Sequence, residues 1–142
     1  MTTSEALVFP AVVDCLANNA ALIAFIPHTD GKARVFDQNT LENQVFPYLV
    51  IGGTTFVPHD VFGKLGQEYT VTIHGWSSKS GKLELVQMHN LVHTALNRFD
   101  ASITGHHWIY CLLEFSELLE EHDRNIDLMH KVERYRILTR EV

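Results

Sequence analysis

Between residues 68 and 99 the spacing of hydrophobic residues changes from a period of two to a period of three or four. Apolar and polar residues alternate over 68–76, EYTVTIHGW, which predicts a β-strand. After a Ser/Lys/Gly break the apolar residues recur at helical spacing, which predicts a helix from about Gly81 to Phe99 with Ser80 as its N-cap. One face of this helix is expected to lie in the core, and it carries Leu85, Met88, Val92, Ala95, Leu96 and Phe99.

The elements on either side are shorter. A helical stripe begins near Phe9, is interrupted at Asn18 and Asn19, and is followed by a short helical stretch that ends before Pro27. Strands are predicted at 33–36, at 47–51, where Gly52-Gly53 ends the run, and at about 131–138. This order predicts an α+β fold in which two main helices pack on one face of a mostly antiparallel sheet of four to five strands.

No period is sustained between residues 54 and 66, and Pro58 and two glycines punctuate this segment. We therefore expect a long loop here. Long loops in compact domains are usually functional or mobile. It carries Phe56 and Phe62, so we expect it to be mobile in a free subunit and to dock on a neighbouring copy or on a partner.

The strand predicted at 106–115, HHWIYCLLEF, is apolar on both faces. Simple alternation places three side chains on one face and four on the other, namely Trp108, Tyr110 and Leu112 against Ile109, Cys111, Leu113 and Phe115. Two helices cannot easily cover both faces of such a sheet. We therefore expect a second copy of the chain to cover the face that the helices leave bare.

The composition fits one globular domain over residues 1–142, with 46% hydrophobic residues and a formal net charge of −6. This charge argues against a protein that holds DNA by neutralising phosphates. Cys15 and Cys111 lack metal-ligand spacing, which indicates buried free thiols in a reducing compartment. The N-terminus is not a secretory signal, and no apolar run approaches the ~20 residues that span a bilayer. We expect a soluble protein that makes no membrane contact and is made in a cytoplasm.

Candidate chemistry is sparse. His89 and His93 have the spacing of metal ligands on a helix, but HNLVH lacks the Glu of a zinc protease. His106 and His107 open a strand, so their rings point to opposite faces. No nucleophile elbow or phosphate loop is present, and we expect no catalytic residue, cofactor or metal. A small metal-binding or ligand-binding α+β domain that uses these histidines stays open as an alternative.

The order of the features is itself informative. FPAVVDCLANNAALIAFI, PYLVIGG, a loop, YTVTIHGWSS and GKLELVQMHNLVHTAL, followed by a strand, an acidic turn and a final strand, resemble the tail-completion family of long-tailed phages. That family includes tail terminators, or tail-to-head joining proteins, and their counterparts in gene transfer agents. The resemblance implies a non-enzymatic ring in the neck of the virion, with six subunits as the usual number.

The resemblance also implies partners. Such a ring would bind the tail tube protein and a head connector or head-completion protein, assemble in the host cytoplasm and let genomic DNA pass through its lumen. Another ring-forming neck part stays open as a second alternative. Because acidic side chains repel DNA, we expect the lumen to be lined by Glu117, Glu120 and Glu121. Copy or partner contacts are expected at Trp76, Trp108, Tyr110, Leu112, Phe56, Phe62, Arg134 and Arg136.

Overall fold

A computed structural model of the chain describes residues 3–37, 45–78, 82–123 and 126–142, with side chains described outside 122–127. Five strands form one sheet in the order β1-β2-β3-β5-β4. The pair of β1 and β2 is parallel and the other pairs are antiparallel. In chain order the elements are α1 (Glu5–Ala17), α2 (Ala20–Phe25), β1 (Val35–Phe36), β2 (Tyr48–Pro58), β3 (Gly66–Ser77), α3 (Leu83–Leu96), β4 (His106–Asp123) and β5 (Ile126–Glu141).

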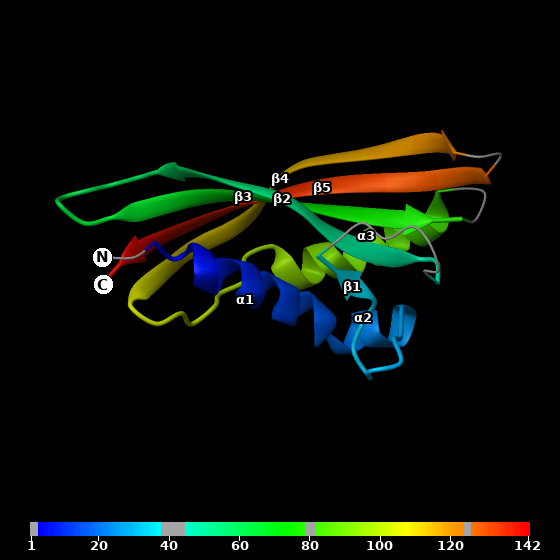
Figure 1. Cartoon of the computed structure of the whole chain (residues 1–142), viewed down its shortest axis with the longest axis horizontal. Coiled ribbons are helices and arrows are strands. Elements are labelled where there is room, and N and C mark those ends of the chain that lie inside the picture. The colour runs from blue at the N-terminus through cyan, green and yellow to red at the C-terminus, as the bar shows by residue number, and fades with distance from the viewer. Residues whose placement is uncertain (1–2, 38–44, 79–81, 124–125) are drawn as a thin grey trace.

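The three helices lie together on one side of the sheet (Figure 1). The β2–β3 hairpin and the β4–β5 hairpin extend from opposite ends of the sheet (Figure 1). The predicted α+β class, the mostly antiparallel sheet and the helices on one face are therefore confirmed. The short helical stretch expected before Pro27 is α2, which lies beside the two main helices.

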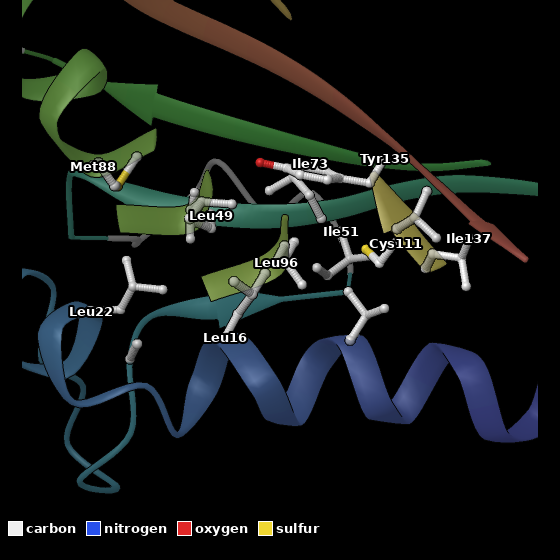
Figure 2. Close-up of a cluster of buried hydrophobic side chains, with 14 of the residues drawn as sticks. Leu16, Leu22, Leu49, Ile51, Ile73, Met88, Leu96, Cys111, Tyr135 and Ile137 are labelled. Carbon is white, nitrogen blue, oxygen red and sulfur yellow. The ribbon is translucent and has the colours of Figure 1, made fainter. Parts of the chain in front are cut away.

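The core lies between the helices and the sheet. Figure 2 shows Leu16 and Leu22 of the first two helices facing Leu49 and Ile51 of β2. Cys111 is buried in the same cluster, whereas Cys15 is only half-buried, and both thiols are free. Burying such a cluster contributes roughly 25 cal/mol per Å² of apolar surface removed from water, which is the main stabilisation of the fold.

The apolar stripe predicted for α3 does face this core. Leu85, Met88, Val92 and Leu96 are buried, and the half-buried Phe99 packs on the same cluster beyond the end of the helix. The helix ends earlier than predicted, at Leu96, where the backbone N–H of Asn97 bonds to the carbonyl oxygen of His93. The predicted cap Ser80 and the predicted first residue Gly81 lie outside the described residues.

The prediction of a long loop over 54–66 is wrong for residues 54–58, which belong to a strand. β2 continues through Gly52-Gly53 to Pro58, because a β-bulge between Ile51 and Thr54 shifts the register while pairing with β3 goes on. Only residues 59–65 connect the two strands. Two glycines that the sequence predicted as a strand end instead mark a bulge within the strand.

β4 contains two bulges that change its faces. Register shifts occur between Trp108 and Tyr110 and between Leu113 and Phe115. Each bulge adds one residue to β4, so the side chains after it no longer follow simple alternation. Trp108 therefore lies on the same face as Cys111, and Phe115 lies on the opposite one, which corrects both predicted sets.

Candidate assembly surface

The side chains of β5 define two faces of the sheet. Glu133 and Tyr135 point toward the helices, since Glu133 lies 3.4 Å from His89 of α3 and Tyr135 lies in the core. Successive side chains alternate, so Arg134 and Arg136 point the other way, to a face that none of the described helices covers (Figure 1). We call it the open face. The register places on it Tyr48, Val50, Glu68, His74, Trp76, Tyr110, Leu112, Phe115, Glu117, Leu119, Glu121, Leu128, His130, Val132, Arg134, Arg136 and Leu138.

One end of the open face is aromatic. The rings of Trp76 and His130 stack with their centroids 3.9 Å apart and their planes 8° from parallel. Trp76 is only 6% exposed, because it forms a second buried cluster with Tyr48, Val50 and Leu128. Its Nε1 atom is buried and has no hydrogen-bond partner among the described residues. Trp76, predicted as a contact residue, is thus largely covered by its own chain.

A chain of polar contacts runs beside this stack. His74 Nδ1 lies 2.8 Å from His130 Nε2, and His130 Nδ1 lies 2.7 Å from Glu121 Oε1. The arrangement fits His74 donating to His130 and His130 donating to the carboxylate. Burial, and then the neighbouring His130, lower the pKa of His74. The imidazole of His74 is therefore neutral at pH 7 and contributes an aromatic wall to the surface rather than a charge.

A cavity of about 520 Å³ opens at this end of the sheet. Gly52 and Gly53 at the β2 bulge belong to its lining, and a Cβ atom added at Gly52 would overlap the imidazole of His74. Its lining is mostly ring and aliphatic surface with one exposed carboxylate. The lining residues are Asp37, Val50, Ile51, Gly52, Gly53, His74, Trp76 and His130.

The middle of the open face carries the arginines predicted for contacts. The guanidinium of Arg134 lies 5.0 Å from the ring centroid of Phe115. Arg136 Nη1 lies 3.8 Å from Glu68 Oε1, and the hydroxyl of Tyr110 donates to Glu68 Oε2 at 3.5 Å. Arg136 Nε is buried without a partner among the described residues. Both arginines are thus held over the sheet.

The predicted set Trp108, Tyr110 and Leu112 is divided between the faces. Trp108 Nε1 donates to the carbonyl oxygen of Phe99 at 2.7 Å on the helix side, whereas Tyr110 and Leu112 pair with Leu138 and Arg136 on the open face. Trp108 therefore closes the core of its own chain. The bulge after Trp108 turns its side chain to the face opposite Tyr110, and this bulge has no signature in the sequence.

The three glutamates predicted for the lumen do not share one face either. Glu117 and Glu121 pair with Val132 and Leu128 on the open face, and Glu120 points to the other side. Glu117 and Glu120 are exposed, and Glu121 accepts from His130. The β4–β5 pair therefore carries these glutamates toward its hairpin turn and Arg134 and Arg136 further from the turn.

The histidines raised as metal ligands are separated. His89 is buried beside Glu133, while His93 is half-buried. Burial lowers the pKa of His89. Burial by itself would raise the pKa of Glu133, but the interaction with His89 and a 2.6 Å hydrogen bond from the hydroxyl of Tyr135 hold that pKa below its usual range. Within the ranges that the structure describes, no three His, Cys, Asp or Glu side chains converge to hold a metal ion. His106 and His107 lie at the start of β4, paired with Glu141 and Arg140.

No pattern in the sequence indicates the cavity or the contacts between His74, His130 and Glu121. Only the register of β3 against β5 brings Trp76 and His130 together.

The fold resembles that of a solved virion protein. A chain of the structure titled "Virion of native gene transfer agent (GTA) particle" matches with a TM-score of 0.75 and 14% sequence identity, over 91% of each chain. At this identity the likeness shows the fold alone. No curated protein sequence matches the chain significantly.

The family model described as "Tail completion protein gp17" matches residues 10–140, which is most of the 142-residue chain. The chain belongs to this family. It is therefore a structural protein of the virion tail and not an enzyme, and the resemblance found in the sequence is confirmed. Among the described residues of this tail completion protein, no helix has the length and apolar composition needed to cross a membrane.

Proposed function

We propose that this tail completion protein is a tail terminator, a ring of six identical copies on the head-proximal end of the tail tube. The ring stops tube polymerisation. It binds the tube protein on one side and a head connector or head-completion protein on the other. Genomic DNA passes through its lumen without specific binding.

The open face is the observation that carries the proposal. It bears Tyr110, Leu112 and the exposed Phe115, and no described helix packs on it. Contiguous apolar surface of this kind marks an interaction site, and a neighbouring copy supplies cover in a closed ring.

The free edge of the sheet supports the same assembly. β4 is an outer strand of 18 residues, and β5 is its one neighbour in the sheet. A long strand edge presents unpaired backbone groups that invite another chain, so soluble proteins usually protect it. A ring of copies covers this edge.

The distribution of charge fits a lumen and a contact at neighbouring positions along the β4–β5 strand pair. We assign Glu117, Glu120 and Glu121 near the far end of the β4–β5 hairpin to the lumen, where negative charge repels the DNA backbone. Arg134 and Arg136 lie further along β5 and are assigned to contacts between copies or with a partner. The side chain of Arg136 is 43% exposed, which leaves its guanidinium accessible to such a contact.

Electron microscopy of tails assembled with and without this chain tests the function. Without it, the tubes should vary in length and fail to join heads, and adding the chain back should restore one length. Tubes of normal length that merely fail to join heads would instead indicate another neck part. Unchanged particles would contradict any role at the end of the tail.

A further inference from the structure

The connection between β2 and β3 presents one aromatic side chain at its tip. Phe62 is 98% exposed, and the backbone N–H groups of Val61 and Lys64 each bond to the other residue's carbonyl oxygen at 3.1 Å. Phe62 and Gly63 have φ angles of 53° and 74°. Positive φ at both central residues of a two-residue connection is the mark of a type I′ hairpin turn.

Phenylalanine is an unusual choice for this position. Type I′ turns favour Asn, Asp or Gly at the first central residue, because other side chains meet steric cost at positive φ. Phe62 thus has an unfavourable backbone conformation and, at 98% exposure, gains almost no burial in its own chain. Strained residues of this kind persist where function requires them, and an exposed aromatic side chain is a typical anchor for a partner.

The cavity at Gly52-Gly53 offers the complementary shape. Its walls include Val50 and the rings of Trp76, His74 and His130, and its volume of about 520 Å³ leaves room for an aromatic side chain. Aromatic rings favour offset-stacked or edge-to-face contact with one another. The cavity would bury the ring that the hairpin exposes.

One chain cannot fill its own cavity with this residue. Gly66, next to the hairpin tip, and Trp76, in the cavity wall, are ten residues apart on β3, which is ~33 Å of strand at ~3.3 Å per residue. Each site also carries one exposed charged residue of opposite sign. The exposed Lys64 lies two residues after Phe62, while Asp37 is at the cavity.

We propose that Phe62 of one copy inserts into the Gly52-Gly53 cavity of the next copy. Such a contact joins two different surfaces of the same chain, so it repeats around an axis and closes into a ring or continues as a filament. This inference rests on the proposed ring and names the contact that builds it. Lys64 then approaches Asp37 of the neighbouring copy.

Covalent trapping tests the geometry directly. The double variant Lys64→Cys/Asp37→Cys keeps Phe62 and should form intermolecular disulfides under mild oxidation, giving a ladder of oligomers on a denaturing gel. Lys64→Cys combined with Asn90→Cys, on the exposed side of α3, is the matched control and should give none. Each single cysteine variant controls for Cys15 and Cys111. A double variant that gives no ladder at the highest soluble concentration overturns the contact.

Two further variants separate the contact from folding. Phe62→Asn suits the left-handed turn, so the monomer should melt at the same or a higher temperature while self-association weakens about 30-fold. Gly53→Leu adds a bulky side chain to the cavity lining and should weaken self-association similarly, and Phe62→Trp should retain it. The measurement is sedimentation velocity over a concentration series.

The outcomes distinguish this contact from the proposed function. If the wild type forms rings and both Phe62→Asn and Gly53→Leu form them equally well, the contact is wrong and the ring stands. If the wild type stays monomeric and no disulfide is trapped, the contact is wrong in solution, and the tail-length assay still tests the terminator role. Loss of association in both variants, with trapping in the double cysteine variant, supports the contact.

Discussion

Val92 on α3 provides the sharpest test of how the helix packs on the sheet. Its side chain is 0% exposed and belongs to the main core cluster. Val92→Ala removes two buried methyl groups, worth ~0.8 kcal/mol each, and leaves a small cavity, so unfolding free energy should fall by about 2–3 kcal/mol. Val92→Asp also places an unpaired carboxylate in this core, and the total loss should reach on the order of 5 kcal/mol.

A loss of that size is comparable with the ~5–15 kcal/mol stability of a whole domain, so Val92→Asp should be unfolded or nearly so at 25 °C. Val86→Asp is the matched control, because Val86 lies on the same helix and is 45% exposed. It should change stability by less than about 0.5 kcal/mol. Urea unfolding followed by circular dichroism, at one fixed protein concentration, measures all three. A Val92→Asp protein that unfolds like the Val86→Asp protein would refute the assignment of the buried face.

Three further predictions concern other parts of the molecule. Burial lowers the folded-state pKa of His89 below its unfolded value of ~6.5, so the wild type should lose stability as the pH falls below ~6.5. The urea midpoint of His89→Gln should fall less steeply with decreasing pH than that of the wild type, and equal slopes would contradict this. An added Cβ at Gly75 would overlap the His89 imidazole, so Gly75→Ala should cost about 1–3 kcal/mol while Gly53→Ala, with open space around it, changes thermal stability little. The purified protein, with a formal net charge of −6, should show no DNA affinity in filter binding at physiological salt, and submicromolar, steeply salt-dependent binding would disprove it.

The elements with one apolar face were predictable because burial and sequence period coincide there. On α3 the residues at helical spacing, such as Leu85 and Met88, are the ones that pack in the core. The alternation in the 68–76 segment likewise gives β3, although the strand is longer than predicted, Gly66–Ser77. Local period carries this information without any knowledge of the partner elements.

The faces of β4 were not predictable, because they depend on two bulges. Residue spacing alone places Trp108 with Tyr110, but the extra residue between the paired positions turns Trp108 toward the helices. A bulge of this kind depends on how the partner strand β5 continues its hydrogen bonds. The same reason explains Gly52-Gly53, where β2 continues past a pair of glycines.

The candidate site was only partly predictable. Phe62 was predicted as a contact residue from its place in a turn-like segment, and its side chain is exposed in the single chain. The cavity depends on Trp76 and His130, which are more than fifty positions apart in the chain and meet only through strand register. Its position therefore required the sheet order, which no local pattern contains.

Cryo-electron microscopy of the head-proximal end of the tail tests the central claim most directly. The account predicts a closed ring of six copies of this chain on the tube, with the open face at the contact between copies and Phe62 of each copy in the cavity of the next. A single copy at that position, or a ring in which the open face of every copy is exposed to solvent, would contradict it.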